Sequence, residues 1–395
     1  MKKRYKIKKY GSIYKNKRRG RSVLKALLFI LLLAVVVFVG YSVAKPLFEF
    51  FSGERQPSAR VSSSNSSSVA GNSSDSSSNQ QQQSSFKVIN LPISVANNSS
   101  ELNSFISEAK ANNYNAVVIE LKDEKGYLYY NSSNQQAIKA NAVSPSAVDI
   151  SSLVSKLKDN SLTPIAKINI FKENIILKAN TDWAVKYMNT QMMWLDNYPD
   201  KGGKAWMNPY VDEAVNYSIS IATELCDNGF PVIMMDSVMY SDGVGTGSAT
   251  YAAPTDSRSR HEVLKSFVTK AKEQINQKNA KLMLCFDSKN AVNSGNYIYA
   301  GANPITFPAD YYAPDISIKR LGAVISVDGN EIKNVSENKS EAISLLLNKF
   351  KASTSPDNII PLLAVDSSSG VSISDKNDII KLYGSLGIDG YYMEE

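Results

Sequence analysis

From residue 86 onward, short apolar runs alternate with longer amphipathic stretches, which is a pattern of buried strands and surface helices. The strand-like runs fall at 87–93, 116–121, 164–171, 231–235, 281–286, 311–318, 359–365 and 390–393. Helical periodicity falls at 101–112, 150–159, 212–228, 258–277, 340–351 and 376–385. This alternation predicts a parallel sheet. Eight strands in a domain of this length favour a closed (β/α)8 TIM-type barrel over residues 86–395. An open doubly wound sheet is less favoured, because no Gly-x-Gly-x-x-Gly motif follows the first strand.

The pattern before residue 86 is different, because residues 26–44 carry no charge and are dominated by Leu, Val, Phe and Ala. At about 1.5 Å per residue a helix of this length spans roughly 28 Å, enough to cross a bilayer. A cleaved signal peptide is the alternative, but its apolar core is usually about 7–15 residues long and ends in an Ala-x-Ala site. We therefore predict a transmembrane helix at 26–45.

Charge divides the chain in the same place. The formal net charge is +7, yet residues 1–25 hold twelve Lys or Arg and no acid. The rest carries 32 basic against 37 acidic residues. The basic tail at 1–25 predicts a cytoplasmic N-terminus and an extracellular C-terminal domain, so we expect a single-pass protein of the cell membrane. A nucleic-acid-binding domain would carry the basic residues on the fold itself, so we expect no nucleic-acid partner. Residues 46–85, rich in Ser, Asn and Gln, predict a disordered linker.

Cysteine and histidine are scarce in the predicted domain. Cys226 lies in a helical pattern and Cys285 in a strand, so we expect buried free thiols, which is typical of export without disulfide formation in a thick-walled bacterium. His261 is the sole histidine, which makes a zinc site improbable. We expect no cofactor and no metal, although calcium held by oxygen ligands stays open.

Acidic residues stand where several predicted strands end. Because active sites of such barrels lie at the carboxyl ends of the strands, these acids would ring one cleft. Close like charges push pKa values apart, which would give the proton donor and the nucleophile or base that glycoside hydrolysis needs. The alternative is that each acid caps the helix that follows it. The candidates are Glu120, Asp123, Asp236, Asp287 and Asp366.

Aromatic residues gather between the third and fourth predicted strands. Trp183, Trp194 and Trp206 all fall there, and Tyr240 follows the fourth strand. Such rings could stack on sugar faces beside the cleft. They could equally form a satellite core under a long loop. The glycine-rich segment 242–247 is predicted to be a mobile loop of the cleft, and it lacks the Gly-Lys-Ser/Thr end of a phosphate-binding loop.

Five segments together resemble a family of bacterial surface proteins classed as glycoside hydrolases, which are barrels distantly similar to the α-amylase clan. The segments are 115–126 (NAVVIELKDEKG), 205–210 (AWMNPY), 229–236 (GFPVIMMD), 360–366 (IPLLAVD) and 387–391 (GIDGY). The resemblance implies an eight-stranded barrel that acts on polysaccharide, with Asp236 as the acid of the fourth strand. By analogy to α-amylases, Asp287 takes the place of the proton donor and Asp366 that of the third carboxylate.

The chain departs from the α-amylase pattern beside the fourth-strand acid. Met234 stands where α-amylases have an arginine, and a missing cation there should raise the pKa of Asp236. Our leading hypothesis is a membrane-anchored glycoside hydrolase acting on cell-wall or environmental polysaccharide. Asp236 would be nucleophile or base, Glu120 or Asp287 the acid, and Asp123 and Asp366 would orient the sugar. The alternatives are a non-catalytic glycan-binding scaffold and, less favoured, a lyase or isomerase acting on phosphorylated substrates.

Overall fold

The computed structural model describes residues 85–251, 257–365 and 370–395. The predicted tail and transmembrane helix, and the predicted linker up to residue 84, lie outside these residues. Within the three described stretches, no helix has both the length and the hydropathy that a membrane span requires.

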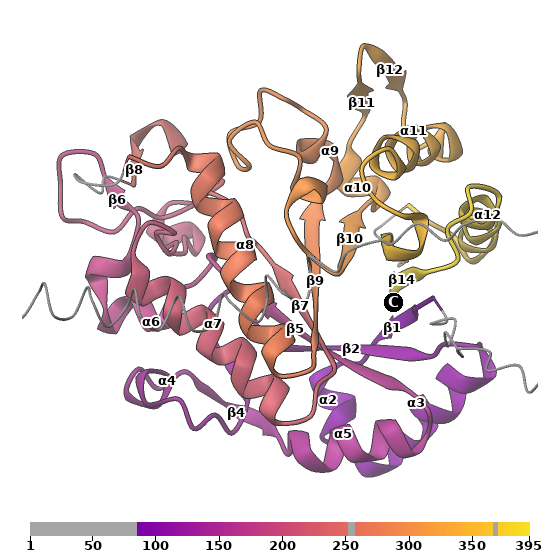
Figure 1. Ribbon diagram of the computed structural model, residues 1–395, viewed down its shortest axis with the longest axis horizontal. Coiled ribbons are helices and arrows are strands. Elements are labelled where there is room, and N and C mark those ends of the chain that lie inside the picture. The colour runs from indigo at the N-terminus through magenta and orange to yellow at the C-terminus, as the bar shows by residue number, and fades with distance from the viewer. Residues whose placement is uncertain (1–84, 252–256, 366–369) are drawn as a thin grey trace, which may run out of the picture. The chain divides into compact units, whose positions relative to one another are not determined.

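Eight parallel strands close into a barrel, as predicted. Each strand pairs with its neighbour in chain order, and β1 pairs with both β2 and β14, which closes the cylinder (Figure 1). The strands are β1 (Lys87–Asn90), β2 (Ala116–Lys122), β5 (Thr163–Asn169), β7 (Val232–Asp236), β9 (Lys281–Asp287), β10 (Tyr311–Asp315), β13 (Leu362–Ala364) and β14 (Tyr391–Glu394). All eight overlap the predicted runs. The alternative of an open doubly wound sheet is therefore wrong.

The longer helices of the described residues lie on the outside of the barrel (Figure 1). They are α3 (Ser99–Ala111), α5 (Ile150–Asp159), α7 (Asp212–Asp227), α8 (Arg260–Gln277), α11 (Lys339–Lys351) and α12 (Ile373–Ser385). Side-chain caps set several of their starts. The capping box of Ser372 and Asp375 begins α12 three residues before the predicted start, and Asn98 begins α3 two residues early.

Shorter elements fill the connections. The helices are α2 (Ile93–Ala96), α4 (Gln135–Lys139), α6 (Ile175–Ala179), α9 (Ser288–Ala291) and α10 (Ile318–Leu321), with single 3₁₀ turns at Thr181–Trp183, Pro199–Lys201, Thr246–Ser248, Pro304–Thr306 and Pro356–Asn358. The additional strands are β3 (Leu128–Tyr130), β4 (Val143–Val148), β6 (Lys186–Tyr187), β8 (Ala249–Thr250), β11 (Val324–Val327) and β12 (Asn330–Lys333). The β3 and β4 strands extend the barrel sheet beside β2, whereas β6–β8 and β11–β12 form separate two-stranded pairs.

The barrel interior has its own apolar core, separate from the core between strands and helices. Side chains alternate between the two faces along each strand, so every second residue points inward. The inner cluster is Phe86, Val88, Ala116, Val118, Ile165, Val232, Met234, Met283, Cys285, Tyr311, Ala313, Ile360, Leu362 and Tyr392. Cys226 and Cys285 are both buried free thiols, as predicted.

Candidate active site at the mouth of the barrel

Charged residues form the inward-facing layer that follows the inner apolar core toward the carboxyl ends of the strands. We call this end of the barrel the mouth. Each of these charged residues stands two residues after an apolar member of the inner core, so the strand alternation places it on the same face. Six strands contribute one such residue each: Glu120, Lys167, Asp236, Asp287, Asp315 and Glu394. The mouth is therefore lined by carboxylates from several strands and by a lysine from β5. Of the predicted acids, this layer contains Glu120, Asp236 and Asp287.

Lys167 lies among three of these carboxylates. Its Nζ is 3.7 Å from Glu120 Oε1, 3.7 Å from Asp236 Oδ2 and 3.8 Å from Glu394 Oε1. The lysine side chain is 12% exposed, against 44% for Glu120, 30% for Asp236 and 42% for Glu394. A nearly buried ammonium thus holds together three carboxylates that solvent can reach.

Burial and neighbouring charges shift the pKa values of Lys167 and Glu120. Burial by itself lowers the pKa of Lys167, but the charges of Asp236, Glu120 and Glu394 outweigh it, and the pKa lies well above its ordinary value. Burial raises the pKa of Glu120, Lys167 opposes this rise, and the charge of Asp236 adds to it. The site therefore combines a permanent cation with a carboxyl group whose proton is retained to higher pH than usual.

A cavity of about 270 Å³ opens beside Lys167 on the β1, β2 and β14 side of the mouth. Its polar lining includes Glu120, Lys167, Glu394 and Asn90. The remaining lining residues are Leu91, Pro92, Ile93, Val118, Tyr129 and Tyr392. A pocket with apolar walls and a few convergent polar groups is typical of a small-ligand site.

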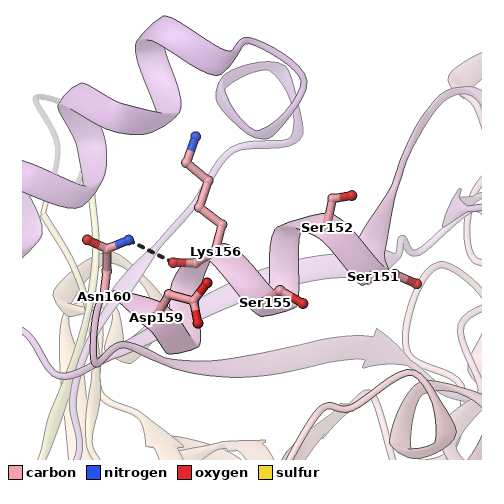
Figure 2. A pocket seen from close by; sticks show the side chains of 6 residues that line it. All are labelled: Ser151, Ser152, Ser155, Lys156, Asp159 and Asn160. Carbon is pink, nitrogen blue, oxygen red and sulfur yellow. Dashed lines mark hydrogen bonds between the residues drawn. The ribbon is translucent and has the colours of Figure 1, made fainter.

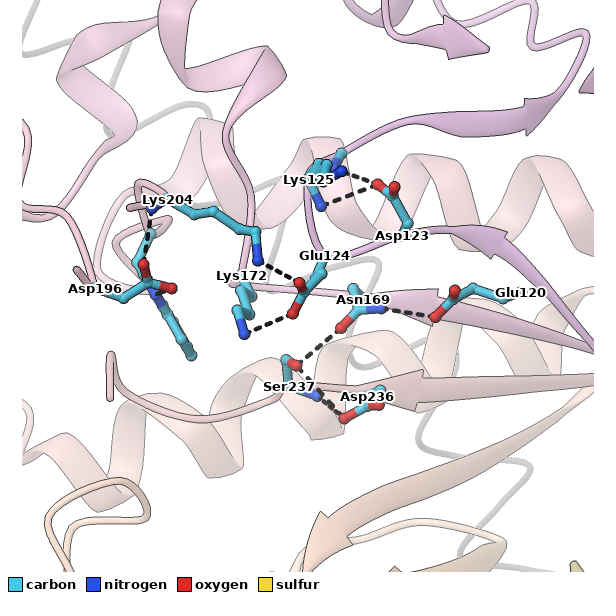
Figure 3. Close-up of polar contacts among 12 residues, drawn as sticks. Glu120, Asp123, Glu124, Lys125, Asn169, Lys172, Asp196, Lys204, Asp236 and Ser237 are labelled. Carbon is cyan, nitrogen blue, oxygen red and sulfur yellow. Dashed lines mark hydrogen bonds and ion pairs between the residues drawn. The ribbon is translucent and has the colours of Figure 1, made fainter. Parts of the chain in front are cut away.

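A hydrogen-bonded chain links Glu120 to Asp236 across β5 (Figure 3). Asn169 Nδ2 donates to Glu120 Oε1 at 3.2 Å, and Ser237 Oγ donates to Asn169 Oδ1 at 2.9 Å. The Ser237 backbone N–H donates to Asp236 Oδ1 at 2.5 Å. Ser237 adopts a φ of +57°, a left-handed conformation that is uncommon for a residue with a side chain and clusters at functional sites.

Asp287 and Asp123 have structural partners. Asp287 Oδ1 accepts a hydrogen bond from Asn290 N at 2.8 Å and caps α9, which is the capping alternative stated for strand-end acids. Asp123 closes the turn after β2, where its Oδ1 accepts from the backbone N–H groups of residues 125, 126 and 127. Within the described residues, the ion pairs of Lys167 are with Glu120, Asp236 and Glu394 and include neither Asp287 nor Asp123. Asp366 lies outside the described residues.

The tryptophans and Tyr240 are packed inside the protein. Trp183, Trp194 and Trp206 are 8%, 0% and 1% exposed, and Tyr240 is 0% exposed. Trp194 Nε1 donates to Gly245 O, and the hydroxyl of Tyr240 donates to Arg260 O. The rings therefore have no open face for a sugar, and they belong to the continuous apolar core between the strands and the helices rather than to a separate satellite core.

The glycine-rich segment is hydrogen-bonded to the loop that carries Trp194. Val244 N donates to Asp196 O at 2.8 Å, and a Cβ on Gly243 would lie 2.2 Å from the same oxygen. Nearby, Glu124 pairs with Lys172 and Lys204, which contribute to a pKa of about 2 for Glu124 despite the opposing effect of burial (Figure 3).

Other hollows lie away from Lys167. One of about 490 Å³ runs along the outer face of α5 and is lined by Ser151, Ser152, Ser155, Lys156, Asp159 and Asn160 (Figure 2). It lies along a single helix and its C-cap, and Asn160 Nδ2 donates back to Lys156 O. Another of about 630 Å³ lies between the loop after β9 and the β11–β12 hairpin. In the described part of the chain, no group of three or more His, Cys, Asp or Glu is arranged to hold a metal ion.

Sequence reasoning did not single out Lys167, Glu394, Asn169 or Asp315. Asp315 lies opposite Asp287 in the β9–β10 register and pairs with Arg320 Nε at 2.5 Å. Burial raises the pKa of Asp315, and the guanidinium opposes that rise. Counting two residues onward from each inward apolar position would have identified Lys167 and Glu394, because a charge at such a position must face the mouth.

The fold and the mouth together define a glycoside-hydrolase-like barrel. The chain belongs to the family described as "Putative glycosyl hydrolase domain", whose model matches residues 88–292, just over half of the chain. No curated protein sequence matches this chain.

This chain is similar to several solved structures, of which the PgaB domain has a TM-score that indicates the same fold. The glycoside hydrolase domain of PgaB (BpsB) from Bordetella bronchiseptica superimposes with a TM-score of 0.58 at 10% identity, covering 78% of this chain and 94% of that one. A hypothetical protein from Ruminiclostridium thermocellum is 23% identical and covers 50% of this chain and 96% of its own, with a TM-score of 0.44. The glycoside hydrolase domain of PelA from Pseudomonas aeruginosa is 14% identical, covers 78% of this chain and 94% of its own, and has a TM-score of 0.40.

Proposed function

We propose that this protein is a membrane-anchored extracellular glycosidase that cleaves a cell-wall or environmental polysaccharide at the mouth of the barrel. The observation that carries the proposal is the placement of Glu120 and Asp236 on either side of Lys167. A glycosidase needs one carboxyl group that keeps its proton and another that is ionised. The raised pKa of Glu120 suits the first role, and the ammonium 3.7 Å from Asp236 suits the second.

The two contacts with Lys167 set an upper limit on the separation of the two acids. Each lies 3.7 Å from the same nitrogen, so the two contacting oxygens are at most twice that distance apart. Retaining enzymes hold their carboxyl groups about 5–5.5 Å apart and inverting enzymes about 6.5–9.5 Å apart. This upper limit on the oxygen–oxygen distance is compatible with both mechanisms. Glu120 is favoured over Asp287 as the acid, since Asp287 is engaged as a helix cap.

In this mechanism Glu120 protonates the glycosidic oxygen as the bond to the anomeric carbon breaks. Asp236 either attacks that carbon or removes a proton from the attacking water. Lys167 stabilises the ionised form of Asp236 and, after the proton leaves, the new carboxylate of Glu120. Glu394 completes the charge balance around the ammonium and lines the cavity in which a sugar ring would lie.

Mutation of the two acids tests the proposal. The full-length chain, purified in detergent, is incubated with peptidoglycan, chitin and starch, and newly released reducing ends are measured. We expect Glu120→Gln and Asp236→Asn each to lower the rate at least ~10²-fold while thermal unfolding stays close to the wild type. Unchanged turnover in Asp236→Asn would refute the assignment. Binding of a glycan without turnover, retained in Asp236→Asn, would single out the scaffold alternative.

The membrane anchor rests on the apolar run at 26–44 and the basic residues before it. Fractionation of cells that produce the full chain tests it. We expect the protein in the membrane pellet, released by detergent but not by high salt, with the C-terminal domain open to added protease in intact cells. The double variant Leu32→Arg, Val36→Arg should reduce the share of the protein in the membrane pellet, because two charges in the bilayer core oppose insertion. An unaltered distribution of that variant would contradict the anchor.

A further inference from the structure

Asn169, the last residue of β5, joins the two candidate catalytic acids through its side chain. Asn169 is a buried residue, with 5% of its surface exposed, and both ends of its side-chain amide form hydrogen bonds. Its Nδ2 donates to Glu120 Oε1 at 3.2 Å and to Lys122 O at 3.4 Å. Its Oδ1 accepts from Ser237 Oγ at 2.9 Å. The orientation of the amide is therefore fixed from both sides, with the donating end toward Glu120.

A buried ion pair holds this residue from below. Lys122 Nζ donates to Asn169 O at 2.8 Å and lies 2.9 Å from Glu173 Oε2. Lys122 is 1% and Glu173 0% exposed. Glu173 Oε1 in turn accepts the backbone N–H groups of residues 174, 175 and 176. The backbone of Asn169 is thus anchored to the start of α6, which leaves its amide little freedom to move.

The consequence concerns where Glu120 carries its proton. The two donors that face this carboxyl group, Asn169 Nδ2 and Lys167 Nζ, both approach Oε1. An oxygen that faces two donors acts as the acceptor, so the acid proton is left for the other oxygen. We propose that Asn169 is a positioning residue that places the Glu120 proton on Oε2 and couples its release to Asp236 through Ser237.

The coupling runs through the serine. Ser237 Oγ has one proton and two acceptors within reach, Asn169 Oδ1 at 2.9 Å and Asp236 Oδ1 at 3.5 Å. Its backbone N–H already donates to Asp236 Oδ1. A change of charge on either acid therefore affects the protonation of the other acid through this hydrogen-bonded chain as well as through Lys167. This inference rests on the proposed function, but the protonation it describes exists without any substrate.

Titration of Glu120 tests the inference without relying on turnover. The full-length chain is produced with ¹³C-labelled glutamate, and Glu120→Gln identifies the Glu120 carboxyl signal. Asn169→Ala removes a donor to the carboxylate, so the midpoint of that signal should move up by about 0.5–1 pH unit. Asn169→Asp should move it further, because it adds a negative charge. The alkaline limb of kcat against pH should shift in the same direction. Asn160→Ala, which removes an amide-to-carbonyl bond on α5, is the control and should leave the midpoint unchanged.

Each outcome decides the matter. An unmoved Glu120 midpoint in folded Asn169→Ala would overturn the inference. If that variant fails to fold, Ser237→Ala replaces it, since loss of the serine hydroxyl frees the amide to rotate. A smaller upward shift is then expected, and no shift would overturn the inference. A shifted midpoint in a protein that cleaves no glycan would leave the role of Asn169 standing and refute the proposed function alone.

Discussion

Lys167 stands level with Met234 in the register of the two adjacent strands β5 and β7, and its Nζ lies 3.7 Å from Asp236. The cation that α-amylases place two residues before the fourth-strand acid is absent from β7 itself. Here the neighbouring strand supplies a positive charge beside the same carboxylate. The expectation that Asp236 lacks a nearby cation was therefore wrong, because it considered one strand only.

Replacement of Lys167 by methionine should impair both activity and stability. Three carboxylates would then face each other without the ammonium. We expect about 1–3 kcal/mol lower stability at pH 7, a range that allows for the partial exposure of the acids. The loss should shrink below about pH 4, as the carboxyl groups take up protons. Turnover should fall ~10²-fold. Urea unfolding across pH measures this, with Lys110→Met on the exposed face of α3 as the control. A loss of stability that does not depend on pH would contradict the electrostatic explanation.

Replacement of Asp287 should affect stability through the cap of α9 and not through the chemistry. Asp287→Ala removes the acceptor for Asn290 N and should cost about 0.5–2 kcal/mol. Asp287→Asn keeps an acceptor at the cap and should be close to neutral. Both variants should hydrolyse glycan within several-fold of the wild-type rate, measured beside Glu120→Gln. If Asp287→Asn loses as much activity as Glu120→Gln, then Asp287 is the proton donor.

Glu120→Gln should stabilise the protein at neutral pH while it removes activity. The folded state raises the pKa of Glu120 and so holds its proton more tightly than the unfolded chain does. Such a group lowers stability as pH rises from below its unfolded value of about 4.3 to above its folded value. The variant should therefore gain less than about 1 kcal/mol at pH 7, given the 44% exposure of the side chain, and nothing near pH 3. Glu108→Gln on α3 should show no such gain, and equal gains in both variants would contradict the burial effect.

Gly126→Ala should be severely destabilising. Gly126 has a φ of +99°, and a Cβ there would lie 1.8 Å from Glu173 Oε1, the buried partner of the ion pair with Lys122. We expect a loss of about 3 kcal/mol or more, from backbone strain and disruption of the pair together. Gly202→Ala is the matched control, because Gly202 has a φ of +75° but no atom within 4 Å of the added carbon. It should cost about 1–2 kcal/mol by thermal unfolding. Equal losses would show that the contact with Glu173 contributes nothing.

The sequence by itself determined the strands, the longer helices and the closed barrel. Alternation with a period of two marks the faces of a strand, and a period of 3.6 marks the apolar side of a helix, so both can be read locally. Strand ends in such a barrel share one face, which is why carboxylates such as Asp236 and Glu120 could be expected at the mouth.

The tertiary structure decided which charges meet and which rings are exposed. Glu394 reaches Lys167 only because β14 closes the barrel against β1, far along the chain from β5. Asp287 was a plausible catalytic acid from the sequence, but in the structure its side chain caps α9, the helix that follows it. Trp194 was likewise a candidate for sugar binding, but contacts with the loop at Gly245 bury its ring. Local patterns cannot settle such questions, because charge pairing and burial are set by neighbours that the chain brings together only when the cylinder closes.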